Sequence, residues 1–474
     1  MRRTVGVGCG AVAAAVVLAD LACTGASSGE VRPGMATWLE GGAIAVEPGS
    51  ETAYVLRTRR EMAPGGGAPR EIDKRLFAVS PDDASVREVA DLLGYGDVRV
   101  VFPRDSILLF AQQGERDELR LLDRAGERTL ATRTSTTWYW GTRVAPSGDF
   151  VVVADNAGEH FPLHVISIPS LAIETVPHDG AWLEAMWLNG GDRLAAIVFY
   201  DPYTRSQRAR ILVWDMRGVA EGGFATDDTG LWPSPVHDIL VPGVSYDFFF
   251  SYTWIGVAPD DSRVVFPVLR AANDVYDGAH ELLVLDMADG TTASVPDAYG
   301  PVAFTPDSSS IVSYRYADQI GSSQSQLLLI DAETLEVDPH PIELPAYDST
   351  HWPTPTFFVS HAGHWILIAG SFGDQQLVLF DTDANAQTQL GGPTIFLGNF
   401  ASRDEHSEIW ISSSGLHRLD LETTSLETIP LDFELGTLNI LPRHDWLVLS
   451  EPANERVHFW DPDTRTTVRT ATLR

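Results

Sequence analysis

The sequence predicts an all-β protein with a single ring of eight or nine four-stranded antiparallel sheets, and three observations support this. A two-part phrase of strand and turn residues returns nine times between Glu47 and Arg474. Successive phrases start 39 to 70 residues apart. Each phrase contains two hairpins, as its alternation and turn chemistry indicate. A repeat of roughly 40 to 50 residues with four strands is typical of one blade of a β-propeller.

The first half of each phrase is an apolar strand, a tight turn rich in Pro, Asp, Gly and Ser, and a strand of β-branched and aromatic residues. Examples are PSGDFVVV from Pro146, PDDSRVVF from Pro259 and PDSSSIVS from Pro306. One such sheet cannot bury both of its faces, so neighbouring sheets must stack around an axis. We therefore expect one domain, although the length alone suggests about three.

The second half is a strand that usually ends in Asp, followed by a turn, as in LLIDAETL from Leu328. Recurrence of this Asp at one place predicts that short carboxylates cap the hairpin. Asp381, Asp383 and Asn385 also begin like a calcium loop, but Ala386 stands where that loop needs Gly. Capping is the first interpretation and a calcium site the alternative. The first unit lacks the Asp in LFAVSPDD from Leu76, which leaves the count at eight or nine.

The repeats resemble those of TolB-type and WD-repeat-like propellers of bacterial envelopes. The resemblance rests on PDDSRVVF from Pro259 with HELLVLDMADG from His280, and on FTPDSSSIVSY with QLLLIDAETLEV from Gln326. It covers nearly all of the mature chain and implies the fold more than the function. Several units have lost the Pro-Asp turn, and no helical domain of the TolB kind precedes the repeats. That difference argues against assigning TolB's partners to this protein.

The first residues resemble an export signal. Arg2 and Arg3 precede an apolar run that is too short to span a bilayer. Leu21 to Cys23, followed by small polar residues, resemble the processing site of bacterial lipoproteins, although Asp20 stands where that motif has an aliphatic residue. We expect a signal peptide at 1–22, lipidation of Cys23, a flexible linker at 23–35 and the propeller at 36–474. If Met35 is the true start, the export signal is absent.

Composition limits the partners. Without residues 1–22 the chain has 64 acidic and 31 basic side chains, a formal charge of −33. Such a surface repels phosphate backbones, which argues against nucleic acid as a partner. The only cysteines, Cys9 and Cys23, lie in the leader, so no disulfide is expected in the mature propeller. We expect a monomer in the periplasm or anchored to the outer membrane, with membrane contact only through lipid.

Three apparent chemical motifs have simpler interpretations. GASSG at 25–29 matches a hydrolase motif but lies in the linker rather than on a strand-to-helix turn. His361 and His364 occupy the position of the tight turn, and no further ligand is spaced to join them. His160 and His164 flank Pro162, which suggests a loop. We therefore predict neither a metal site nor a cofactor.

Loops outside the repeat are the candidates for function, because rigid scaffolds bind through their loops. The long connections are 61–73, 200–210, 217–250, 270–280 and 317–326, and four of them join a second strand to a third. Aromatic and acidic residues of these loops and of the inter-blade connectors either fill the blade interfaces or form a binding surface. The predicted binding residues are Trp140, Trp182, Asp201, Tyr203, Tyr252, Trp254, Tyr276, Tyr299, His351 and Trp352.

These observations predict that the protein is a non-enzymatic cell-envelope propeller that binds a protein or polysaccharide through one face. Aromatic rings beside carboxylates suit stacking on sugars or anchoring of a protein, because they bury area at small entropic cost. The alternative is a hydrolase or lyase whose carboxylates and histidine converge at the central opening. Its candidates are His351, Asp348, Asp247 and Asp201. Convergence of these four side chains cannot be derived from spacing.

Overall fold

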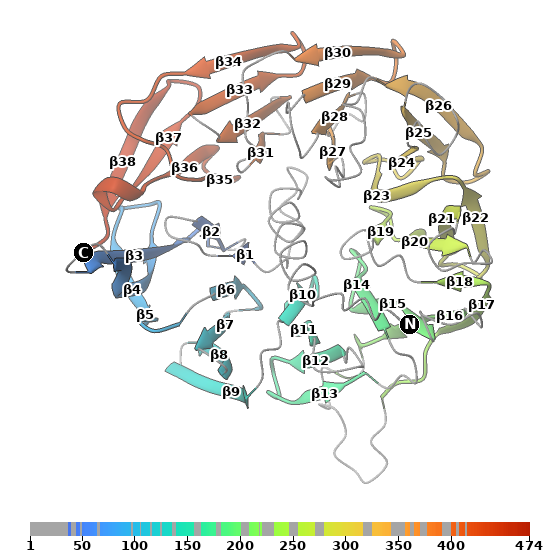
Figure 1. Ribbon diagram of the computed structural model, residues 1–474, viewed down its shortest axis with the longest axis horizontal. Helices are drawn as coiled ribbons and strands as arrows, with labels where there is room; N and C mark the ends of the chain where they lie inside the picture. The colour runs from blue at the N-terminus through green and yellow to red at the C-terminus, as the bar shows by residue number, and fades with distance from the viewer. Residues whose placement is uncertain are drawn as a thin grey trace, which may run out of the picture.

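The structure is a computed structural model in which strands form a ring around a central axis (Figure 1). The described residues contain nine antiparallel sheets, one for each phrase of the sequence. The all-β propeller prediction is therefore confirmed, with the higher of the two blade counts. The structure describes residues 37–38, 44–47, 50–63, 67–95, 98–104, 106–113, 116–123, 126–134, 139–155, 163–176, 182–200, 208–217, 219, 232–245, 255–270, 279–315, 325–342, 356–360, 365–369, 377–390, 400–403, 407–412 and 415–474.

The first four blades follow in chain order. Blade 1 contains β2 (Ile44–Val46), β3 (Ala53–Ala63), β4 (Gly67–Val79) and β5 (Val86–Asp91). Blade 2 contains β6 (Val98–Val101), β7 (Ile107–Gln113), β8 (Arg116–Asp123) and β9 (Gly126–Thr134), with β1 (Thr37–Trp38) as a fifth strand. Blade 3 contains β10 (Tyr139–Val144), β11 (Phe150–Asp155), β12 (Leu163–Ser167) and β13 (Ile173–Thr175). Blade 4 contains β14 (Trp182–Trp187), β15 (Arg193–Tyr200), β16 (Arg208–Asp215) and β17 (His237–Pro242).

The remaining blades complete the ring. Blade 5 contains β18 (Val244–Ser245), β19 (Gly256–Val257), β20 (Arg263–Arg270), β21 (Ala279–Asp286) and β22 (Thr292–Pro296). Blade 6 contains β23 (Tyr299–Phe304), β24 (Ser310–Arg315), β25 (Ser325–Asp331) and β26 (Val337–Ile342). Blade 7 contains β27 (Thr356–Val359), β28 (Trp365–Ala369), β29 (Leu377–Asp381) and β30 (Ala386–Leu390). Blade 8 contains β31 (Phe400–Arg403), β32 (Glu408–Ser412), β33 (Leu416–Asp420) and β34 (Ser425–Ile429). Blade 9 contains β35 (Leu438–Leu441), β36 (Trp446–Glu451), β37 (Arg456–Asp461) and β38 (Thr466–Thr472), with a short 3-10 helix η2 (Pro452–Asn454).

Each blade is a meander whose strands follow one another from the axis outward (Figure 1). The irregular first unit forms a blade of its own, and it is the preceding β1 that joins another sheet by pairing with β6. The predicted long connection 217–250 contains the outer strand β17 and the short β18, so it is only partly loop. The predicted loop 61–73 is also mostly strand, since β3 and β4 extend to Ala63 and from Gly67. No helix among the described residues is long and apolar enough to cross a membrane.

Apolar side chains between the blades form the core. Between blades 4 and 5, for example, one cluster of 17 buried residues includes Phe199, Ile211 and Phe266. Phe266 and Trp410 are fully buried, and Trp214 is 2% exposed. Burial of one such aromatic side chain removes a large apolar area from water, so these contacts dominate the stability of the ring.

The ring closes where blade 1 meets blade 9, without exchange of a strand between them. Blade 9 is formed by β35 to β38 alone, and blade 1 by β2 to β5. Eleven buried apolar residues, including Val55, Phe77, Val448 and Phe459, join the two sheets. Side-chain contacts therefore hold the closure.

The hairpin turns explain the Asp that ends the third strand of most blades. Asp331 Oδ1 accepts hydrogen bonds from the backbone N–H groups of Glu333 (3.0 Å) and Thr334 (2.7 Å). Asp381, Asp420 and Asp461 accept the equivalent pairs of bonds in blades 7, 8 and 9. In blade 1, Ser80 Oγ takes this role by accepting from the N–H of Asp82 (3.3 Å). The predicted hairpin capping is confirmed.

A second set of turns, between strands one and two, links five of the blades to the preceding one. The linking residue has a positive φ, which points its side chain or carbonyl toward the neighbouring turn. Asp261, for instance, accepts from the N–H of Asn189 (2.6 Å), and Ser308 Oγ accepts from the N–H of Asp260 (3.1 Å). We name this set the turn belt: Glu51, Gly148, Asp261, Ser308 and Asp445.

Candidate binding surface

Strand direction divides the connections between two ends of the ring. In a four-stranded meander the first and third turns share one end, and the middle loop and the inter-blade connector share the other. The turn end therefore carries the capped hairpins and the turn belt. The loop end carries the long connections 201–207, 271–278 and 316–324, which lie between second and third strands. These three connections are outside the described residues.

The structure places three predicted residues on strands that start at the loop end. Trp140, Trp182 and Tyr299 lie at or next to the first residue of β10, β14 and β23, which are innermost strands of their blades. Their side chains are outside the described part of the molecule. The same holds for all atoms of the other predicted residues, which are Asp201, Tyr203, Tyr252, Trp254, Tyr276, His351 and Trp352, for the lipidation candidate Cys23, and for the enzyme candidates Asp348 and Asp247.

The best described part of the loop end is a two-stranded extension of blade 1, where the sequence predicts a loop. Strands β3 and β4 have 11 and 13 residues, and their pairing continues through Arg60 and Glu71 to Ala63 and Gly67. Strand β5 pairs with β4 only as far as Arg75. We call residues 57–75 the arginine ribbon, because six of its residues are basic and five of these are arginines.

Arginine side chains attach the base of the ribbon to blade 9. Arg57, which is 6% exposed, donates from Nη1 to the carbonyl of Leu473 (2.9 Å) and pairs through Nη2 with Asp73. Arg59 forms a two-point ion pair with Glu455. Hydrogen bonds from Arg59, opposed by burial, lower the pKa of Glu455. The ribbon is therefore held against the neighbouring blade by charge-assisted hydrogen bonds, the stronger class.

On its other side the ribbon is attached by Lys74, the single lysine of the sequence. Its ammonium group is buried and donates to the carbonyl of Tyr95 (2.7 Å) in the connector to blade 2. The Tyr95 hydroxyl donates to Glu118 of β8 (2.8 Å). A lysine is rarely this buried unless its charge is compensated, so this chain of contacts indicates a fixed joint between blades 1 and 2.

Blade 9 contains a carboxylate, a histidine and a hydroxyl in a row. His458 contacts Glu451 through Nε2 (2.9 Å) and Thr470 through Nδ1 (3.0 Å). Because a carboxylate only accepts, Nε2 donates to Glu451, and Nδ1 shares a hydrogen bond with the Thr470 hydroxyl. Burial would raise the pKa of Glu451, but hydrogen bonds from Asn454 and His458 outweigh it and lower that pKa.

The row resembles the base and nucleophile of a hydrolase, but its recurrence indicates a structural role. His164 pairs with Thr175 (3.1 Å) and His417 with Thr428 (3.0 Å) across the same two strands of blades 3 and 8. A feature repeated in three sheets belongs to the sheet, and the ring of His458 is also stacked on Phe433. We assign it no catalytic role.

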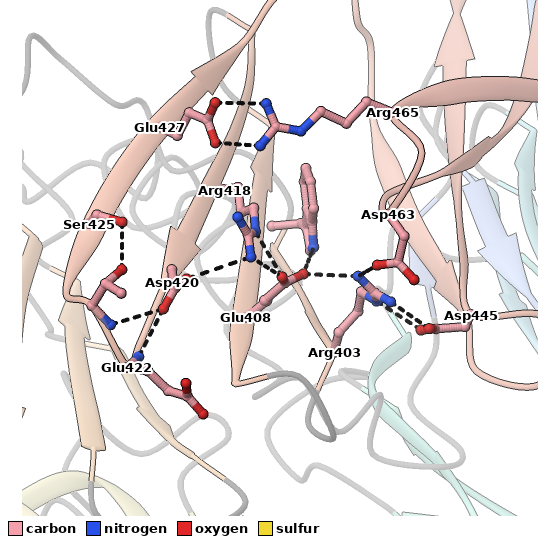
Figure 2. Close-up of polar contacts among 12 residues, drawn as sticks. Arg403, Glu408, Arg418, Asp420, Glu422, Ser425, Glu427, Asp445, Asp463 and Arg465 are labelled. Atoms are coloured by element: carbon pink, nitrogen blue, oxygen red, sulfur yellow. Dashed lines mark hydrogen bonds and ion pairs between the residues drawn. The ribbon is translucent and has the colours of Figure 1, made fainter.

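At the turn end, blades 8 and 9 share a dense ion network, which Figure 2 shows. The guanidinium of Arg403, whose side chain is 1% exposed, contacts Glu408 (3.0 Å), Asp445 (2.8 Å) and Asp463 (3.0 Å). Glu408 also accepts from Arg418 and from Trp410 Nε1 (3.1 Å). Burial would lower the pKa of Arg403, but its bonds to Asp445 and Asp463 raise it. Each of these charged groups contacts a group of opposite charge, so the network joins blades 8 and 9.

Metal chemistry finds no support at the described residues, where no three His, Cys, Asp or Glu side chains are grouped as ligands. Asp381 of the calcium alternative uses Oδ1 to cap its turn, and Asn385 Oδ1 contacts the ring of His340 (2.6 Å). The residues that would have formed the loop are therefore engaged in the hairpin and in the contact between blades 6 and 7.

The sequence matches no protein-family model and no curated protein. Similar solved structures include TolB from Acinetobacter baumannii, at 9% identity over 80% of each chain with a TM-score of 0.33. An oligogalacturonate lyase from Vibrio parahaemolyticus shares 13% identity over 86% of this chain and 95% of its own, with a TM-score of 0.40. A prolyl endopeptidase shares 10% identity over 77% of this chain, which spans 54% of the endopeptidase, with a TM-score of 0.43.

Likeness at these identities concerns the fold alone. A second TolB, from Agrobacterium tumefaciens, is also among the similar structures, at 13% identity over 64% of this chain and 94% of its own, with a TM-score of 0.30. The ring of antiparallel sheets makes the chain an all-β propeller, as its repeat motifs predict.

Proposed function

We propose that this protein is a non-enzymatic, exported β-propeller that binds an envelope protein or polysaccharide through its loop end. The observation that carries the proposal is the contrast between the two ends of the ring. Apart from the connection 216–236 between β16 and β17, the described hairpins at the turn end are short, and several are capped by their own side chains, whereas the long connections between second and third strands belong to the loop end. Function in rigid scaffolds concentrates on such loops.

The amino-acid composition of the loop end favours a binding function over a catalytic one. The connections there supply Tyr203, Tyr276 and Trp352, and the innermost strands add Trp140 and Trp182 at their loop-end starts. Aromatic side chains of limited flexibility are the usual anchors of binding surfaces. The His–Thr pairs among the described residues recur across the sheets of blades 3, 8 and 9, as a structural feature does.

The leader supports the location. Its basic start, apolar run and Cys23 give the pattern of an exported lipoprotein, with residues 1–22 removed and Cys23 carrying lipid. Mass spectrometry of the mature amino terminus tests this part separately. A diacylglyceryl group on Cys23 is the expected result, and a chain that starts at Met35 would contradict both export and anchoring.

Site-specific photo-crosslinking in the native envelope tests the binding face. A photoreactive residue at Trp254 or Trp352 is expected to give discrete adducts, while the same residue at Asp383, which is exposed at the turn end, gives none. The double variant Trp254→Ala, Trp352→Ala should lose the partner in pull-down while keeping its thermal unfolding temperature. Equal adducts from both ends, or an unchanged pull-down, would contradict the proposal.

A further inference from the structure

The arginine ribbon differs in charge from the rest of the molecule. Residues 57–75 contain six basic and three acidic side chains, a net charge of +3. The remaining residues have a net charge of −35, so the whole chain has a net charge of −32. A basic segment on an otherwise acidic protein makes the potential there less negative than elsewhere on the surface. An anionic group that approaches this protein is therefore favoured at the ribbon and repelled elsewhere.

Two arginines of the ribbon have guanidinium groups that a ligand can contact. Arg60 and Arg70 are exposed, and their side chains form no hydrogen bond or ion pair with another described residue. The other basic residues of the ribbon are engaged, since Arg57, Arg59 and Arg75 pair with carboxylates and Lys74 is buried. A free guanidinium has a planar set of donors that matches a carboxylate.

The ribbon also has unpaired backbone. The register between β4 and β5 ends at Arg75 and Asp91, so from Gly67 to Asp73 strand β4 has β3 as its only partner strand among the described residues. A strand edge with free N–H and C=O groups is a template for an extended polypeptide. A sugar polymer or a nucleic acid cannot form such a ladder.

Apolar exposure marks the same place. Ile72, at the irregularity in register between β3 and β4, is 47% exposed. Leu93 is 46% exposed, and it follows Leu92, whose backbone N–H donates to the carbonyl of Lys74. Two of the five exposed large hydrophobic side chains of the described chain therefore lie beside the free edge. Arginine with aliphatic side chains is a composition common at protein interfaces.

We infer that the arginine ribbon binds an extended segment of a partner protein in which acidic residues alternate with apolar ones, paired to the free edge of β4. This inference rests on the proposed binding function and names its partner class. A uniformly anionic polymer is disfavoured, because Glu61 and Glu71 lie in the ribbon between the arginines and the body beyond it is acidic. In an alternating polypeptide the carboxylates can be spaced to meet Arg70 on β4 and Arg60 on β3, with apolar residues beside Glu61 and Glu71.

Fluorescence anisotropy with a labelled ten-residue peptide, in which Glu alternates with Ile and Thr, tests the inference on the full mature chain. The peptide is expected to bind, more weakly as salt rises. The double variant Arg60→Glu, Arg70→Glu should weaken binding by about tenfold or more, since it replaces attraction by repulsion at two contacts. Arg87→Glu, a matched change at an exposed arginine of β5, should leave the affinity within about twofold, because it lies off the free edge.

A second peptide separates backbone pairing from charge. N-methylation of every other backbone amide removes the donors for the ladder and should abolish binding while the charge is unchanged. The inference is overturned if the first peptide does not bind, if the methylated peptide binds equally, or if polygalacturonate competes at equal carboxylate concentration. In those cases crosslinking from Trp254 and Trp352 still decides whether the loop end binds a partner by other residues.

Discussion

Different contacts hold the closing interface, between blades 9 and 1, and the internal interface between blades 4 and 5. The internal interface buries a cluster of 17 apolar residues and needs one linking turn, at Asp261. The closure buries 11 and adds charged contacts from Arg57, Arg59 and His444, the last lying between Glu51 (2.5 Å) and Asp82 (3.3 Å). At the closure, polar contacts therefore supplement a smaller apolar core than the one between blades 4 and 5.

Removal of a core aromatic should give the largest effect at either interface. Phe266→Ala and Phe77→Ala each delete a side chain with at most 1% exposure, so each should cost about 3–5 kcal/mol. The locations should differ: Phe77→Ala should raise amide hydrogen exchange in β2, β3, β35 and β36, and Phe266→Ala in β15, β16 and β20. The same regions responding to both changes would mean that the two interfaces are one cooperative unit.

Arg57→Met should weaken the closure alone. It removes the donor to Leu473 and one partner of Asp73, but Arg75 still contacts Asp73 (2.8 Å), so we expect a loss of about 2–3 kcal/mol. Arg210→Met is the control, because its pair with Asp238 is exposed and should contribute about 1 kcal/mol or less. Thermal unfolding with exchange at β38 measures both, and equal losses would remove the distinction between the interfaces.

Acid should weaken the closure in a way that the internal interface does not share. Burial would raise the pKa of Asp73, but bonds from Arg57 and Arg75 lower it, and the pKa of Glu455 is lowered by Arg59. A carboxyl group with a lowered pKa in the folded state stabilises fully above its unfolded pKa, about 3.9 for Asp and 4.3 for Glu. That stability is lost as pH falls through the folded values. The difference in Tm between wild type and Glu455→Gln should therefore be largest near neutral pH and vanish in strong acid, and a constant difference would contradict the assignment.

The smallest expected effect is a gain in stability at the outer hairpin of blade 8. Thr424 has a φ of 52° in the outer hairpin of blade 8, a conformation that a β-branched residue adopts at a cost. Thr424→Gly should stabilise the protein by about 1 kcal/mol, as seen in a higher Tm. Thr423→Gly, at the preceding position without a positive φ, should destabilise it. A loss from Thr424→Gly would mean that its side chain has a packing role.

Local chemistry made the fold predictable, and long-range contacts made the candidate surface less so. The capping by Asp331, Asp420 and Asp461 follows from residues two or three positions away, so its sequence signal is short and repeated. The strands of the ribbon are hard to predict from the sequence, because glycines and prolines near its tip favour a loop. The bond from Arg57 to Leu473 spans 416 residues, and no spacing rule indicates it.

The joint at Lys74 has a practical consequence for chemistry on this protein. Reagents directed at amines meet a sequence whose only lysine is enclosed between two blades, so in the folded state they can modify little besides the chain terminus. Acylation of Lys74 would then report the opening of blades 1 and 2 directly. A lysine introduced at any chosen position would provide a single handle for attaching a dye or a surface.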